Sequence, residues 1–544
     1  MDGREMKKAA FIAAMALSAA PFLTVLAGGL DGFVGVTMPD PPVPGDSDTY
    51  EQAWHFWWVG TSIRAGTDPR VCPLIGLPGP GSLAGSNIGW PDAVLFGLLC
   101  GSDLRCAAFL SLLCGTLLAA SAGFLFARSW GLGAAASALA AVMSAWAPAR
   151  AAHVLQHYHV AGFGWVLLSM ALLRIFLVRG RPWLLPAFAL SLLLASMQSA
   201  YHTLFGALGS FLVALATIAS RRVPAARTAS ASGAFAVAMV LSYLFFESFP
   251  GGMPPVMDRA EAVYWAAEPA SFLLPSPFGI PWVLSGAGPA MSWMPNLFEG
   301  VVTPGLTVLL LALLFLLRRR SRGIATAEDR RGLLLLAILS VIPFALALGP
   351  WLKFMGRPVG IPMPFAILQD VPLLEGARSP SRFAILGTCM LAVPAAAAAS
   401  SLGRRAGAAA ALLAVLELVP PGLPTIPDTI PSVYRDVHPG GTALEIPATE
   451  MARRHGYFMT ADGRGRPVFF HTRRSTAIPA AFDPFRTDSP DTVSVDDALA
   501  TGVDVILYNR WMYDEARRDE LDARFEALFP DAPPGDSVWI WTRG

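Results

Sequence analysis

Two carboxylates stand two residues apart near the N-terminus of the chain. Asp46 and Asp48 follow the proline-rich run Met38-Pro-Asp-Pro-Pro-Val-Pro-Gly, whose prolines restrict the backbone. In an extended backbone residues i and i+2 point the same way, so these carboxylates could share a proton or a divalent cation. Acidic residues beside Pro and Gly also occur in loops that are merely solvated. We predict acid–base chemistry here, with substrate contacts from Tyr50 and His55 and with any divalent cation optional.

Aromatic residues follow the acidic pair. Trp54, Trp57, Trp58 and Ile63 have helical spacing with polar residues between them, which is typical of a helix that lies in a membrane interface. An ordinary interfacial tryptophan belt is the alternative. Such a helix would form a floor for a site at the level of the lipid headgroups.

Histidines gather in the next polar joints of the chain, the segments that connect one apolar run to the next. His153, His157 and His159 lie in one joint and His202 lies in the following one. Imidazole can bind a metal, hydrogen-bond a phosphate or transfer protons near neutral pH. The spacings do not match a zinc signature such as His-Glu-x-x-His. We therefore predict substrate contacts from His157 and His159 rather than a metal site.

Charged residues late in the chain complement the acidic pair. Arg378 and Arg382 are four residues apart, where the chain re-enters an apolar run, and Glu299 ends a long polar joint. Guanidinium groups suit phosphate recognition. Interaction with lipid phosphates by long side chains, or pairing with Glu375, explains the two arginines equally well. We include Glu299, Arg378 and Arg382 among the predicted substrate-binding residues.

The composition identifies the environment in which these residues work. The 544 residues are 54% hydrophobic and only 15% charged, and the mean hydropathy is +0.51. Soluble proteins have about 25% charged residues, so a soluble enzyme is excluded. A net charge of +1 gives no basic field for nucleic acid. The five cysteines mostly lie in or beside apolar runs, so we expect small hydrophobic side chains and neither disulfides nor zinc.

Apolar runs long enough to cross a bilayer recur up to about Leu418. We predict a multi-span α-helical membrane protein with about eleven transmembrane helices in residues 1–419 and a first external loop at 31–103. Arginine-rich joints alternate with joints poorer in basic charge, which places the N-terminus in the cytoplasm and the protein in the inner (plasma) membrane. Residues 420–544 are charged and contain strand-like runs, including 466–471, so they predict a small extracytoplasmic α/β domain.

The layout and several motifs resemble the GT-C superfamily of glycosyltransferases that use polyprenyl-phosphate sugars. The similar stretches are Gly45-Asp46, Tyr50 with Trp54-His-Phe-Trp57-Trp58, and Arg378-Ser-Pro-Ser-Arg382-Phe383. The Trp-Trp-Asp-Tyr-Gly signature of the oligosaccharyltransferases does not occur after Pro420, so protein N-glycosylation is not expected. In the lipid-A and protein O-glycosylating members the acidic pair is Asp-Glu, whereas this sequence has Asp46-Ser-Asp48.

The resemblance implies an inverting transfer of a sugar from a polyprenyl-phosphate donor to a glycan, lipid or protein acceptor, in contact with membrane lipids. It implies that Asp46, or as second choice Asp48, accepts the proton of the acceptor hydroxyl. Arg378 or Arg382, helped by His157 or His159, would stabilise the departing phosphate.

Three other functions remain open at the level of sequence. A polysaccharide ligase or polymerase is disfavoured by the acidic first loop and the C-terminal domain. A transporter of lipid-linked sugars would favour ionisable residues in the middle of its spans, and here they lie near the ends, as Arg174 and Glu417 do. A non-catalytic scaffold for envelope assembly is the third alternative.

Overall fold

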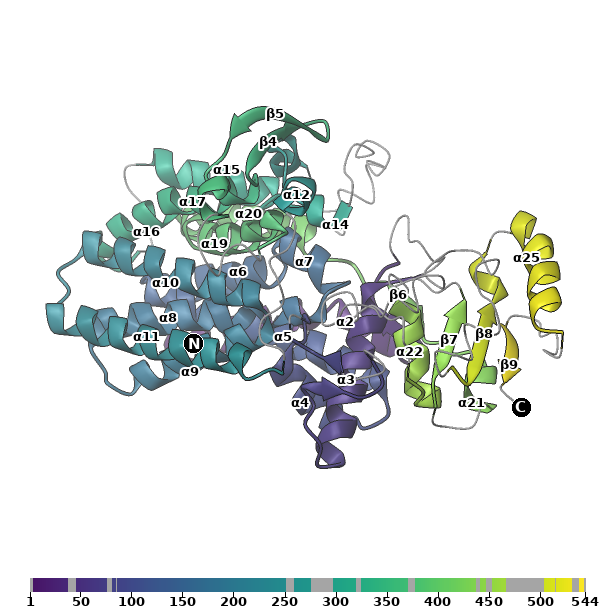
Figure 1. The fold of residues 1–544 in the computed structure, drawn as a ribbon. Coiled ribbons are helices and arrows are strands. Elements are labelled where there is room, and N and C mark those ends of the chain that lie inside the picture. Colours follow the sequence, from purple (N-terminus) through teal and green to yellow (C-terminus); the bar gives the residue numbers. More distant parts are fainter. Residues whose placement is uncertain are drawn as a thin grey trace.

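The computed structural model describes residues 3–37, 46–75, 81–84, 86–250, 259–274, 297–318, 324–369, 377–436, 441–446, 453–465, 503–513, 515–530 and 538–542. Helices dominate up to residue 418, and a segment with a small sheet follows (Figure 1). The predicted strand at 466–471 lies outside the described residues.

The helical part is a bundle of roughly aligned helices (Figure 1). Its α-helices are α1 (Gly3–Ala19), α2 (Phe22–Ala27), α3 (Asp48–Arg64), α4 (Trp90–Leu99), α5 (Leu104–Ser129), α6 (Ala134–Ala145), α7 (Pro148–Val154), α8 (Gly164–Arg179), α9 (Leu184–Gln198), α10 (Ala200–Ser220), α11 (Ala225–Glu247), α12 (Arg259–Tyr264), α14 (Leu297–Gly300), α15 (Leu306–Leu317), α16 (Ala327–Leu339), α17 (Val341–Ala347), α18 (Phe365–Leu368), α19 (Phe383–Ser401) and α20 (Arg404–Leu418). Short 3₁₀ helices are η1 (Tyr158–Phe163), η2 (Pro269–Leu273) and η4 (Pro380–Arg382), and short strands are β1 (Gly32–Val34), β2 (Val71–Cys72), β3 (Gly81–Ser82), β4 (Trp351–Phe354) and β5 (Arg357–Pro362).

Six helical segments of the described chain are long and apolar enough to cross a bilayer: Leu104–Ser129, Tyr158–Arg179, Ala200–Ser220, Ala225–Glu247, Ala327–Ala347 and Pro380–Ser401. Four shorter apolar helices, α4, α6, α9 and α15, accompany them. The chain is thus a multi-span helical membrane protein, as the composition predicted, while the number of about eleven spans stays a prediction.

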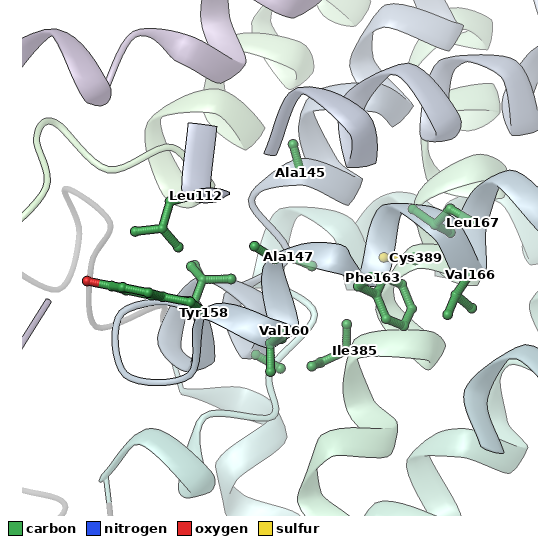
Figure 2. Packing of buried hydrophobic residues seen from close by; sticks show 14 of the residues in the cluster. Leu112, Ala145, Ala147, Tyr158, Val160, Phe163, Val166, Leu167, Ile385 and Cys389 are labelled. Atoms are coloured by element: carbon green, nitrogen blue, oxygen red, sulfur yellow. The ribbon is translucent and has the colours of Figure 1, made fainter. Parts of the chain in front are cut away.

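The core of the bundle is formed by α5, which packs against α6, η1 and α8, and by α19, which packs against α6. Figure 2 shows Phe163 of η1 and Val166 of α8 among the buried hydrophobic side chains, together with Ile385 and Cys389 of α19. The hydroxyl of Tyr158 donates a 2.6 Å hydrogen bond to the carbonyl oxygen of Val34. This packing fixes the histidine-rich joint against β1, at the start of the first loop.

An N-cap starts α3 at the acidic pair. Ser47 has an extended backbone, and its Oγ accepts a hydrogen bond from the backbone N–H of Thr49 at 3.2 Å, as N-cap residues do. The predicted helix is present, but the expectation that its tryptophans face the membrane interface is wrong for two of them. Trp54 and Trp58 are buried, because α3 packs against α4 and against a helix of the C-terminal segment.

The expectation of small hydrophobic cysteines without disulfides is wrong for two of the five. Cys100 and Cys106 form a disulfide with a Cα–Cα separation of 5.8 Å. The chain reverses between α4 and α5, and this turn brings together two residues that are six positions apart. Gly101, Ser102 and Asp103, residue types that favour a turn, stand between the two cysteines.

The disulfide is expected to make a modest contribution to stability. Closing a loop of this length stabilises a protein by about 2 kcal/mol in the chain-entropy model. We expect the double variant Cys100→Ser/Cys106→Ser to melt at a lower temperature in detergent than the wild type. Cys114→Ser, which removes a free cysteine, is the matched control. Equal melting of all three proteins would contradict the prediction.

The C-terminal segment pairs with the first loop through one strand and ends in a small sheet. Strand β6 (Thr425–Pro427) pairs antiparallel with β1. Strands β7 (Ala443–Ile446), β8 (Val505–Asn509) and β9 (Val538–Thr542) form a sheet in that order, parallel and then antiparallel. Helices α21 (Val433–Asp436), α22 (Arg453–Asp462) and α25 (Glu515–Leu528) and the 3₁₀ helix η7 (Arg510–Met512) accompany it. The boundary of a separate domain at residue 420 stays a prediction.

Candidate functional site

The carboxylate of Asp46 binds the N-terminal end of α22. Its Oδ2 accepts a hydrogen bond from the backbone N–H of Arg453 at 3.0 Å, and its Oδ1 accepts one from that of Arg454 at 3.1 Å. The first N–H groups of a helix have no partner inside the helix and favour a negative charge. The side chain of Asp46 is completely buried. Asp46 therefore ties the first loop to the C-terminal segment.

Asp48 has different partners from Asp46. Its Oδ2 lies 2.8 Å from Nε2 of His157, and its Oδ1 contacts Nε of Arg453. The side chain of Asp48 keeps 15% of its surface exposed, whereas Asp46 has none. Arg453 also lies 3.6 Å from Oδ2 of Asp46 through one of its terminal nitrogens, so its guanidinium bridges the pair. Asp48 is consequently the more exposed carboxylate of the two.

The pKa values of the two carboxylates are shifted in opposite directions. Burial raises the pKa of Asp46 to about 6, against the opposing effect of the Arg453 guanidinium. Burial also acts on Asp48, but Arg453 and His157 outweigh it and hold the pKa of Asp48 well below its ordinary value. Burial, together with Arg382, lowers the pKa of His157. At neutral pH Asp48 is therefore charged, and a neutral His157 donates its Nε2–H to it.

The raised pKa of Asp46 predicts a pH dependence of stability. The pKa of Asp46 is higher in the folded protein than its ordinary value of 3.8. The protonated carboxyl therefore contributes its full stabilisation below pH 3.8, and this stabilisation is lost as the pH rises through about 6. We expect the wild type to lose stability relative to Asp46→Asn over this interval. The measurement is the difference between their melting temperatures in detergent, from about pH 4 to about pH 7. A constant difference, or one of opposite slope, would contradict the raised pKa.

A second polar cluster surrounds Glu299 on α14. Its Oε1 accepts a 3.0 Å hydrogen bond from Nε of Arg382 and contacts a terminal nitrogen of the same guanidinium, and its Oε2 accepts a 2.7 Å bond from the hydroxyl of Ser381. Nε2 of His153 lies 3.5 Å from Oε2. Burial opposes the charge of Glu299, but Arg382 lowers its pKa to about 2. All four side chains are buried, so the ion pair is screened little by water.

The two clusters adjoin through the histidines of α7 and η1. The ring centroids of His153 and His157 are 5.9 Å apart, and those of His157 and His159 are 5.7 Å apart. Arg382 and Glu299 both act electrostatically on His157, and Arg378 acts on Asp48. The structure therefore gathers the acidic pair, the histidine joint, Glu299 and the two late arginines in one region.

The remaining predicted residues have varied surroundings. Arg378 lies 3.5 Å from Glu261, and both side chains are partly exposed. His159 is buried, and among the described residues neither of its ring nitrogens has a hydrogen-bond partner. His55 lies 3.8 Å from Glu51 on the same helix. The hydroxyl of Tyr50 donates a 2.8 Å bond to the carbonyl oxygen of Pro427, so Tyr50 contributes to the junction with the C-terminal segment.

Arg453 and His153 are site residues that the sequence predictions did not assign. Arg453 is separated from Asp46 by about 400 residues, and local spacing gives no signal for such a contact. His153 belongs to the histidine joint that the sequence indicated, without a stated role. Among the described residues, no group of three or more His, Cys, Asp or Glu side chains could hold a metal ion. Arg453 supplies positive charge between the acidic pair, and the optional cation stays a prediction.

At the level of sequence, no family model and no curated protein matches the chain. Its structure is similar to that of the arabinofuranosyltransferase AftD from Mycobacteria, with a TM-score of 0.57 and 15% identity over 99% of this chain and 40% of that one. It also matches an oligosaccharyltransferase of Archaeoglobus fulgidus, with a TM-score of 0.48 and 13% identity over 92% of this chain and 68% of that one. Another structure of an oligosaccharyltransferase from that archaeon, AglB with an inhibitory peptide and a dolichol-phosphate, gives a TM-score of 0.44 and 12% identity over 93% and 69%.

The similarity to AftD defines the class of fold. AftD is a GT-C membrane glycosyltransferase, and the chain has a multi-span helical membrane fold similar to that of AftD. The resemblance predicted from the sequence is confirmed at this level. The chain spans about two fifths of the length of the arabinofuranosyltransferase.

Proposed function

We propose that the chain is a membrane glycosyltransferase that moves a sugar from a polyprenyl-phosphate donor to a glycan, lipid or protein acceptor of the cell envelope. The observation that carries the proposal is the Asp48–His157 pair, 2.8 Å apart, beside the buried Arg382–Glu299 pair. A charged, partly exposed carboxylate next to cationic groups suits a reaction that deprotonates a hydroxyl and releases a phosphate.

Asp48 is the proton acceptor in this proposal. Both oxygens of Asp46 already bind backbone N–H groups of α22, and its side chain is completely buried. Asp48 is the more exposed of the two and is charged at neutral pH, so we assign it to the acceptor hydroxyl. The resemblance to the GT-C superfamily favoured Asp46, with Asp48 as second choice. Asp46 instead holds the first loop on α22, and His157 orients Asp48 by its hydrogen bond.

Arg378 is the first contact for the donor phosphate in this proposal. It is about one-fifth exposed, and its pair with Glu261 is long at 3.5 Å, so a phosphate can replace that partner. The guanidinium of Arg382 is buried and bound by Glu299. Arg382 therefore adds positive potential close to His157, and direct contact with the phosphate would require it to leave Glu299.

The site lies at the outer face of the plasma membrane in this proposal. The Cys100–Cys106 disulfide closes the end of the first loop, and disulfides persist in oxidising compartments outside the cytoplasm. Arg174, inside the last two turns of α8, and Arg221, immediately after α10, both pair with Asp329. They lie toward the ends of these helices opposite to the histidines. Basic residues at that end agree with a cytoplasmic location.

The proposal is tested by transfer with defined donors. The purified protein in lipid nanodiscs would receive short-chain polyprenyl-phosphate pentofuranoses and hexoses with an envelope extract as acceptor. A pentofuranose is the first choice, because the similar structure belongs to an arabinofuranosyltransferase. We expect release of polyprenyl phosphate that depends on the acceptor. Release from nucleotide sugars alone, or envelope glycans and lipids unchanged in cells that lack the protein, would overturn the proposal.

A further inference from the structure

The β4–β5 hairpin has the reverse of the arrangement expected in water. Its lysine, Lys353, is 3% exposed, and Nζ donates a 3.1 Å hydrogen bond to the carbonyl oxygen of Tyr264. Large apolar side chains face outward instead, with exposed fractions of 41% for Trp351, 66% for Phe354, 62% for Met355, 48% for Val359 and 53% for Ile361. In water this orientation leaves apolar surface exposed without compensation.

The hairpin is held in this orientation by the segment that precedes it in the bundle. The backbone N–H of Gly356, in its turn, donates a 2.7 Å hydrogen bond to Oε1 of Glu268. The N–H of Ala267 donates a 2.9 Å bond to the carbonyl oxygen of Ala347, immediately before the hairpin. With the Lys353 bond, these contacts hold β4 and the turn of the hairpin against the bundle, while all six residues of β5 are exposed. The outward apolar face is therefore a stable feature of the fold.

The outward face continues the lipid-facing surface of a membrane span. The span Ala327–Ala347 ends four residues before β4 begins. Its side chains Ile338 and Val341 are 57% and 61% exposed, as expected for contact with lipid tails. Figure 1 shows β4 and β5 at the edge of the bundle, beyond the helices. The hairpin thus lies at the depth where a span leaves the bilayer.

We propose that this outward face is inserted into the bilayer interface and that its partner is lipid. Tryptophan and long basic side chains favour this depth, and Trp351 and the exposed Arg357 supply both. Addition of a peptide strand is disfavoured, because β5 has proline at positions 358 and 362, without backbone N–H groups. The inference needs only a membrane location and does not depend on the proposed function.

Lipid contact can be measured with single-cysteine variants labelled with an environment-sensitive fluorophore. The background is Cys114→Ser, in which the other two free cysteines, Cys72 and Cys389, are buried. Labels at Phe354→Cys and Val359→Cys report on the hairpin. A label at Val237→Cys in α11 is the lipid-facing control, and one at Asp519→Cys in α25 is the water-facing control; both parent side chains are exposed.

In lipid nanodiscs we expect both hairpin labels to be quenched by nitroxide lipids as strongly as the label at Val237→Cys, with headgroup-proximal nitroxides more effective than those deep in the chains. The label at Asp519→Cys should respond only to an aqueous quencher. Hairpin labels that behave like Asp519→Cys would overturn the proposal. So would protection from both quenchers together with crosslinking of the hairpin to a second copy, because the partner would then be protein. Two labelled positions guard against a local effect of either substitution.

Discussion

Asp48→Asn is expected to lower kcat/KM for sugar transfer by roughly 100- to 10,000-fold, the range that general acid–base catalysis supplies. Asparagine keeps the size of the side chain and can still accept the hydrogen bond from His157. It cannot accept a proton from the acceptor hydroxyl, and it no longer balances the charge of Arg453. The measurement is the initial rate of polyprenyl-phosphate release in nanodiscs at saturating and limiting donor.

Asp46→Asn is the matched control for this prediction. It makes the same chemical change two residues away, at a carboxylate that binds α22. We expect it to retain far more activity than Asp48→Asn and to alter the protection of the C-terminal segment against proteolysis. Reversal of this order, with Asp46→Asn the more damaging for catalysis and harmless for the C-terminal segment, would assign the proton transfer to Asp46. Equal transfer by wild type and both variants would favour a scaffold without catalysis.

Local features of the site could be predicted from the sequence because they depend on neighbouring residues. A helix that contains the aromatic residues follows from their spacing, whereas its start at Asp48, capped by Ser47, was found only in the structure. The separation of apolar spans from a polar C-terminal segment depends on composition over long windows. The types and spacing of individual residues identified the acidic pair, the histidine joint and the late arginines as the chemically informative residues.

The partners of these residues could not be predicted, because they are set by contacts between distant elements. Only one residue separates Asp46 from Asp48, yet α22 covers Asp46 and leaves Asp48 partly exposed. The same helix covers Trp54, whose indole Nε1 lies 3.3 Å from Sδ of Met459. Aromatic spacing alone had suggested a helix that faces the membrane, because it gives no sign of this distant partner. The position of α22 depends on its contacts with α3 and α21 and on the strand pair β1–β6, which holds the start of the C-terminal segment on the first loop.

Glu299→Leu is expected to destabilise the protein by about 3–5 kcal/mol, the typical effect of removing one partner of a buried ion pair. The variant leaves the guanidinium of Arg382 buried without its carboxylate and leaves the hydroxyl of Ser381 without its acceptor. Thermal unfolding in detergent, followed by tryptophan fluorescence, measures the change. Glu261→Leu is the control, because the Glu261–Arg378 pair is long and partly exposed and such pairs contribute at most about 1 kcal/mol.

The double variant Glu299→Leu/Arg382→Met separates the structural role of the pair from a role in transfer. Replacing both charges by apolar groups of similar volume is often neutral, so the double variant should recover most of the stability that Glu299→Leu loses. If Arg382 supplies positive potential for the departing phosphate, the stable double variant will still transfer sugar slowly, with the loss in kcat rather than in folding. A double variant as unstable as Glu299→Leu would contradict the buried pair, and full activity in a stable double variant would remove Arg382 from the mechanism and leave the phosphate to Arg378.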